Sequence, residues 1–87
     1  MKMLENRGHL LITLEVTSEI SIYRPIVEQH YLGEWFDSVP EALLKGLRSW
    51  KITLAGFKRN VPGKTRAQTI VTEYREALER LGIEINE

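Results

Sequence analysis

The basic side chains in the middle of the chain are the residues best suited to bind a ligand. Between Glu41 and Glu73 there are seven lysines or arginines and no acid. Such a segment attracts phosphate groups if its side chains meet on one exposed surface. We therefore predict a binding site for nucleic acid or another polyanion in the segment 45–66. Its candidate residues are Lys45, Arg48, Lys58, Arg59, Lys64, Thr65 and Arg66.

The tripeptide Gly63-Lys64-Thr65 has the order that ends a phosphate-binding P-loop. The full motif is absent, because it needs glycine at position 58, which is Lys58. What the residues still predict is a basic loop that enters a helix N-terminus, where unpaired amides favour an anion. The alternative is a solvated loop in front of an ordinary capped helix.

Three other groups of residues could carry a function. Trp35-Phe36 either pins the loop before the first helix or is an aromatic anchor for a protein partner. Glu28 and His30 would share one face of a strand, as a base and the group that orients it would, although most such pairs are surface residues. His9 and His30 lack the spacing of metal ligands, and there is no cysteine for a disulfide or a thiolate. We therefore expect no catalytic residue, metal or cofactor.

Composition predicts one folded domain over residues 1–87. Hydrophobic residues make up 43% and charged residues 28%, as in ordinary globular proteins. The formal net charge is zero, so only the uneven layout of charge favours a partner. No apolar run has the length of a signal peptide or a membrane span, which indicates a cytoplasmic protein without a membrane contact. A domain this small has limited core, so self-association is also a hypothesis.

The N-terminal third predicts a small antiparallel sheet. Alternating apolar residues over 10–16 are typical of a strand with one buried face, and residues 20–23 would complete a hairpin. Pro25 should interrupt the pattern. The stretch 26–32 then favours a third strand over a short helix that begins at Pro25 and ends at Gly33.

Two amphipathic helices should follow the sheet. Ser38-Val39-Pro40-Glu41 is a capping box that predicts a helix start at Ser38, with Gly46 on the buried face, where it would let another element approach closely. The helix should end near Ala55, although Lys51–Phe57 also fits a strand. Thr65-Arg66-Ala67-Gln68 is a second capping box and predicts a helix from Thr65 to Leu81, ended by Gly82. Residues 83–85 could add a short edge strand.

These elements predict a two-layer α+β fold, with the antiparallel sheet packed against both helices; the alternative order is ββαβα(β). The favoured function is a non-catalytic regulatory or accessory module that binds nucleic acid through the basic segment. The alternative is an adaptor that binds a protein partner or itself through Trp35 and Phe36 without contacting nucleic acid.

Overall fold

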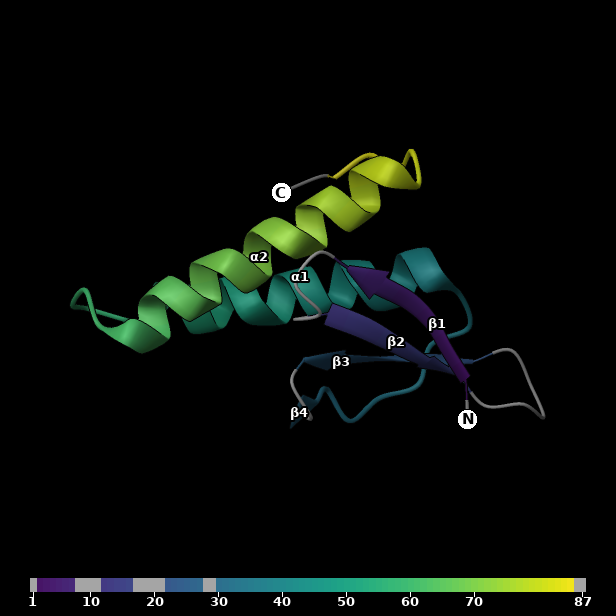
Figure 1. The fold of residues 1–87 in the computed structure, drawn as a ribbon, viewed down its shortest axis with the longest axis horizontal. Helices are drawn as coiled ribbons and strands as arrows, with labels where there is room; N and C mark the ends of the chain where they lie inside the picture. Colours follow the sequence, from purple (N-terminus) through teal and green to yellow (C-terminus); the bar gives the residue numbers. More distant parts are fainter. Residues whose placement is uncertain (1, 8–11, 17–21, 28–29, 86–87) are drawn as a thin grey trace.

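A sheet and a pair of helices form the two layers of the molecule (Figure 1). The computed structural model describes residues 2–7, 12–16, 22–27 and 30–85. The strands are β1 (Lys2–Arg7), β2 (Ile12–Val16), β3 (Tyr23–Val27) and β4 (His30–Tyr31), and the helices are α1 (Val39–Ala55) and α2 (Pro62–Arg80). This arrangement confirms the predicted α+β class.

The sheet is antiparallel throughout, and its strand order β1-β2-β3-β4 follows the chain. β1 was not expected, because the residues Lys2–Arg7 do not alternate between apolar and polar; its pairing with β2 also shifts register between Met3 and Asn6. The separate third strand expected over 26–32 is not found, since Ile26 and Val27 complete β3 and only the two residues of β4 follow. The expected strand residues 10 and 11 lie outside the described ranges.

Pro25 lies inside β3, so the prediction that it interrupts the strand is wrong. It faces Leu14 across the β2–β3 pair. Tyr23 exchanges two backbone hydrogen bonds of 2.7 Å with Phe36, on the side of β3 away from β2. Residues two apart in a strand direct their amides to the same side, so the N–H that proline lacks would not have pointed at β2. The proline therefore costs the β2–β3 pairing no hydrogen bond.

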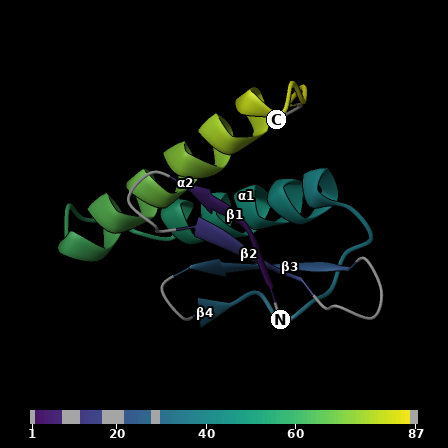
Figure 2. The same ribbon diagram turned by 45° about the vertical axis from the view of Figure 1, so that its right-hand side comes forward.

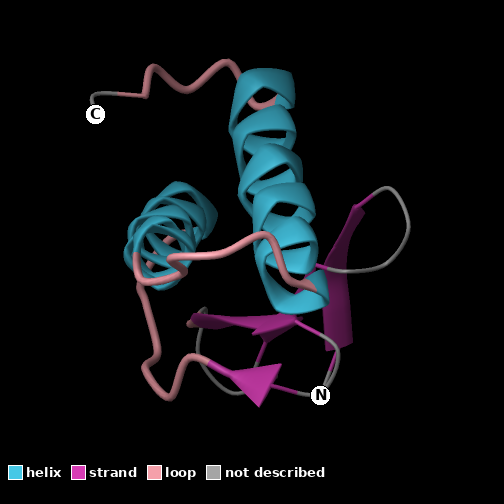
Figure 3. Ribbon diagram, turned by 90° about the vertical axis from the view of Figure 1, so that its left-hand side faces the viewer, coloured by secondary structure: helices cyan, strands magenta, loops and turns pink. Residues whose placement is uncertain are grey.

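Both helices lie on one face of the sheet (Figure 3), and α1 packs against β3 while α2 packs against β2. A single hydrophobic core fills the space between the layers. Its fully or nearly fully buried members are Ile12, Leu14, Val27, Ala42, Leu43, Leu47, Ile70, Val71, Tyr74, Ala77 and Leu78.

α1 begins and ends where the sequence predicts. Ser38 is the N-cap, and its Oγ accepts a hydrogen bond of 3.2 Å from the amide of Glu41. At the other end the amide of Gly56 donates to Ile52 and Thr53 carbonyls, so the chain stays helical through Ala55. The alternative strand over Lys51–Phe57, and with it the ββαβα(β) order, is therefore wrong.

The close approach predicted at Gly46 is confirmed. A Cβ atom at this position would overlap the ring of Tyr74, which crosses from α2 onto α1. The Tyr74 side chain is fully buried, and burial raises the pKa of its hydroxyl above the ordinary value. Gly46 thus sets how closely the two helices pack.

α2 begins three residues earlier than predicted, at Pro62, with Val61 as an N-cap that has no side-chain hydrogen bond. Proline fixes the φ angle of a first helical residue and has no amide to leave unpaired, which favours the earlier start. Gly82 ends the helix with φ 72°, as expected, and its amide donates to the Glu79 carbonyl. Residues 83–85 form no strand; Ile83 and Ile85 pack against the core instead.

Candidate anion-binding surface

The α1–α2 hairpin extends past the sheet at one end (Figures 1 and 2). We call this end the hairpin tip and define it as residues 51–65, which cover the last turn of α1, the connection 56–61 and the first turn of α2. None of the described strands lies beneath it in either view. The charge of the tip is therefore presented to solvent from more than one side.

Phe57 and Gly63 hold the tip together. Phe57 leaves α1 just after its C-cap, and its half-buried ring lies against the first turn of α2. A Cβ atom at Gly63 would stand only 3.2 Å from that ring. Glycine at this position lets the connection fold back on α2, so the basic residues beside it have a defined place.

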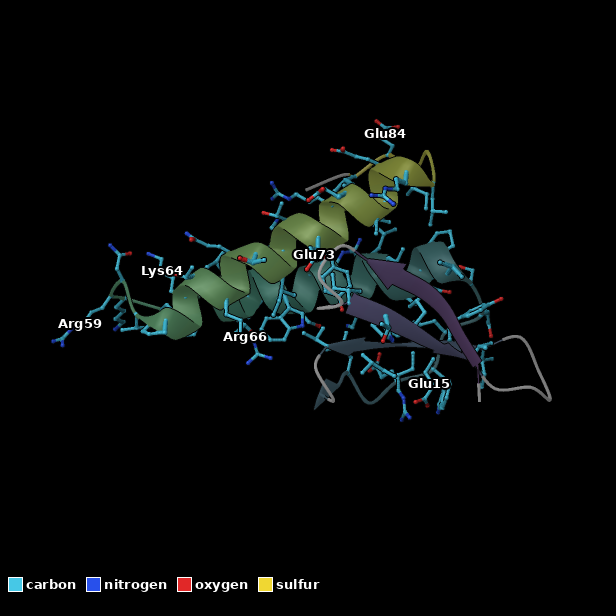
Figure 4. The ribbon with its side chains drawn as sticks, viewed as in Figure 1. Glu15, Arg59, Lys64, Arg66, Glu73 and Glu84 are labelled. Carbon is cyan, nitrogen blue, oxygen red and sulfur yellow. The ribbon has the colours of Figure 1, made fainter. Side chains whose placement is uncertain are left out.

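Three predicted residues lie at the tip. Lys58 and Arg59 are exposed on the connection, and Lys64 is half-buried in the first turn of α2. Arg59 and Lys64 lie at the outer end of the hairpin (Figure 4). Among the described residues none of the three forms an ion pair, and the nearest acids along the chain are Glu41 and Glu73.

The other predicted bases lie along the sides of the hairpin. Arg66 follows Lys64 by two residues, about 200° around the helix axis, and points to the other side of α2, nearer the sheet (Figure 4). Lys45 and Arg48 are exposed on α1, and Lys45 lies about 15 Å from the end of that helix. The structure therefore brings together three of the six predicted basic residues at the tip and spreads the others around it.

At Gly63-Lys64-Thr65 the N-terminus of α2 has few unpaired amides to offer an anion. Because α2 starts at Pro62, the amides of Lys64 and Thr65 already donate to the Val61 carbonyl, at 2.9 and 3.3 Å. Pro62 has no amide, which leaves Gly63 alone with a free N–H in the first turn. Thr65 is exposed and lies inside α2, where its carbonyl accepts a hydrogen bond from the Thr69 hydroxyl. Because the N-cap of α2 is Val61, the predicted second capping box is wrong.

Acidic residues gather at the other end of α2. Glu76, Glu79 and Glu84 are exposed, and Figure 4 shows Glu84 at the end of the hairpin opposite Arg59. Glu73 is buried, with 6% of its surface exposed, and both carboxylate oxygens lack a hydrogen-bond partner among the described residues. The tip thus carries bases without an acid, whereas the far end of α2 carries more acids than bases, the bases there being Arg75 and Arg80.

An ion pair and a stacked ring occupy the face of the sheet opposite the helices. β2 was expected to bury one face, yet Glu15 is only 3% exposed, because Arg24 on β3 lies directly opposite and contacts its carboxylate at 2.6 Å. The Arg24 guanidinium also lies 4.4 Å from the ring centre of Trp35. This group cannot be recognised in the sequence, since a charged pair on neighbouring strands becomes visible only once the register is known.

The two residues predicted as an aromatic anchor differ in their environment. Trp35 has 40% of its surface exposed and keeps one side available beyond its contact with Arg24. Phe36 is half-buried, packs against the core and pairs through its backbone with Tyr23. Of these two residues, Trp35 is the one that exposes a large part of its side chain to solvent.

Ile52 is an exposed residue that sequence analysis did not single out. It lies on α1 one turn after Arg48, on the side away from the core, with 75% of its surface exposed. Helical spacing would have revealed it, because Ile52 falls four residues after an exposed arginine rather than after a buried leucine.

The remaining candidates concern catalysis and metal binding. His9 and Glu28 lie outside the described residues, as does the side chain of His30, so their pairing stays a prediction. Within the described ranges no three acidic or histidine side chains come close enough to bind a metal ion. Neither of the two described helices has the length and apolar composition needed to cross a membrane.

The chain was compared with protein-family models, curated proteins and solved structures, and none of them matches it. The placement of charge at the tip is therefore the basis for inferring a function.

Proposed function

We propose that this protein is a non-catalytic module that binds the phosphate backbone of nucleic acid through its hairpin tip. One observation carries the proposal: the part of the hairpin that extends past the sheet has Lys58, Arg59 and Lys64 without a carboxylate among them. Cations at such a site displace the counterions condensed on a nucleic acid and gain free energy from their release.

The balance of charge over the whole chain makes this placement informative. The protein has 12 bases and 12 acids, so its net charge does not attract a polyanion. Only a local excess of positive charge on its surface can bind one. The acids of α2 lie at the far end of the hairpin, where they repel phosphates and so orient the protein with its tip toward the ligand.

The test measures binding to a short DNA duplex at increasing salt concentrations, with fluorescence anisotropy as the readout. We expect the affinity to fall steeply as salt rises, with a slope that counts the phosphates neutralised by the protein. The double variant Arg59→Ala/Lys64→Ala should flatten the logarithmic slope by about 1.8, or about 0.9 for each phosphate that the variant no longer neutralises.

Arg80→Ala is the matched control for Arg59→Ala. It removes the same charge from an exposed arginine at the acidic end of α2. Arg80→Ala should leave the slope unchanged, whereas Arg59→Ala should reduce it by about 0.9. Equal effects of the two variants would mean that the tip has no special role, and an affinity that ignores salt would refute the proposal.

The second candidate function is a protein-binding module, and the exposed Trp35 favours it. Its ring is held in place by Arg24, and a pre-positioned aromatic side chain is a common anchor of protein interfaces. A pull-down or sedimentation experiment in which Trp35→Ala removes a complex, while Arg59→Ala/Lys64→Ala keeps it, would favour this function over nucleic-acid binding.

A further inference from the structure

Ile52 is the most exposed large hydrophobic side chain among the described residues. Its exposed fraction of 75% exceeds those of Leu81 at 46%, Trp35 at 40% and Val61 at 37%. An isoleucine in this position contributes little to the core, and water solvates it poorly. A partner that covers Ile52 would therefore gain free energy.

The neighbours of Ile52 restrict the chemistry of that partner. Lys45 and Arg48 precede Ile52 by seven and four residues and so share its side of α1, while the small residue Ala55 follows three residues later. On this side of α1, at the start of the hairpin tip, the apolar Ile52 is thus bordered by the cations Lys45 and Arg48. Charge complementarity selects a partner with anionic groups next to an apolar surface.

We propose that Ile52 contacts the sugars or bases of the nucleic acid whose phosphates the hairpin tip binds. The inference depends on the proposed function and narrows it. A chain of bare phosphates offers nothing to an isoleucine, whereas a nucleic acid has apolar sugar edges, base edges and thymine methyl groups beside its phosphates. The ligand is therefore nucleic acid rather than any polyanion of equal charge.

Three variants and two ligands test this inference. The first variant is Ile52→Ala, and its matched control is Leu81→Ala, which truncates an exposed apolar residue at the other end of the hairpin. Each is titrated against a short DNA duplex and against inorganic polyphosphate over a range of salt. Arg59→Ala is included as the electrostatic reference.

Ile52→Ala should weaken duplex binding about fivefold at every salt concentration, because the interaction that it removes is apolar. The slope against salt should stay that of the wild type, whereas Arg59→Ala changes it. Polyphosphate should bind Ile52→Ala and the wild type equally well. Leu81→Ala should match the wild type on both ligands.

Several results would overturn the inference while the proposed function stands. One is duplex binding by Ile52→Ala at wild-type strength, and another is an equal weakening on duplex and polyphosphate. A third is a wild-type protein that self-associates in sedimentation while Ile52→Ala does not, since a second copy would then cover the residue.

Two further outcomes separate the remaining cases. In the first, the wild type binds vesicles of anionic lipid and Ile52→Ala does not, while both bind the duplex with equal affinity. This result would assign Ile52 to a lipid surface and overturn the inference. Failure of the wild type to bind the duplex at any salt would refute the proposed function, and the inference with it.

Discussion

The part of the molecule where the helices cover the sheet, which we call the base, differs from the hairpin tip in how its side chains are matched. At the base, Gly46 of α1 is in close contact with the Tyr74 ring of α2, and on the sheet Glu15 has its charge balanced by Arg24 on the neighbouring strand. At the tip, Arg59 and Lys64 have no described acid to pair with, and Ile52 is largely exposed. We infer from this contrast that the base contributes most of the free energy of folding, while Arg59, Lys64 and Ile52 at the tip are side chains that folding does not need.

Arg24→Ala should cause the largest decrease in stability and so test the role of the base. It leaves the Glu15 carboxylate, 3% exposed, without the cation that lies 2.6 Å away. An uncompensated buried charge costs about 3 kcal/mol, which urea denaturation would measure. A decrease below about 1 kcal/mol would show that water reaches Glu15 and that the pair is an ordinary surface contact.

Gly46→Ala should be the next most severe change, because its Cβ atom would overlap the buried ring of Tyr74. We expect a destabilisation of about 2 kcal/mol in urea denaturation, although alanine favours a helix over glycine. The added variant Tyr74→Leu is the control. If the clash is the cause, Gly46→Ala should cost less in the Tyr74→Leu background than in the wild type, and additive effects would contradict this explanation.

Tyr74→Phe should alter how stability depends on pH. Burial raises the pKa of the Tyr74 hydroxyl, so the folded protein holds this proton at pH values where the unfolded chain loses it. The contribution is complete below about pH 10, the ordinary tyrosine value, and is lost as the pH rises above it. Urea denaturation at increasing pH should therefore show a shallower alkaline decline for Tyr74→Phe than for the wild type.

Arg59→Ala/Lys64→Ala should have the smallest effect on stability and so sharpen the contrast. Both side chains lie at the tip without a described ion pair, so the free energy of unfolding should change by less than about 0.5 kcal/mol. Thermal and urea denaturation would check this expectation beside the binding titration. A destabilisation as large as that of Gly46→Ala would mean that the tip is part of the folding core.

Helix positions were the most predictable part of the fold, because local signals and tertiary packing agree there. Ser38 caps α1, Gly82 ends α2, and Gly46 marks the close approach of the two helices, as the sequence indicated. The start of α2 was misplaced because Pro62 begins a helix without a side-chain cap, so the capping-box pattern at Thr65 falls inside the helix.

The sheet was harder to predict, since its elements depend on distant partners. Pro25 fits within β3 only because its missing amide faces away from β2, and no local pattern contains that information. The burial of Glu15 likewise depends on an arginine placed opposite by the strand register. Strand limits and buried polar pairs are long-range properties, whereas helix caps are local.

The residues of the candidate site could be predicted from the sequence, but their arrangement in space only in part. The absence of acids between Glu41 and Glu73 located the bases, and the structure places three of them at one end. Lys64 and Arg66 point to different sides because they are two residues apart on a helix, which follows only once the helix start is known. The exposure of Ile52 follows from helical spacing once α1 is known to continue through Ala55.

The early start of α2 has an electrical consequence for the tip. α1 brings its carbonyl end there and α2 its amide end, so the opposite poles of two antiparallel helices lie at the same place and largely cancel. With Pro62 lacking an amide and those of Lys64 and Thr65 engaged, the peptide backbone adds little net potential of its own. The electrostatic potential at the tip thus comes mainly from its charged side chains. Acetylation of Lys58 or Lys64 would remove one positive charge each and lower that potential.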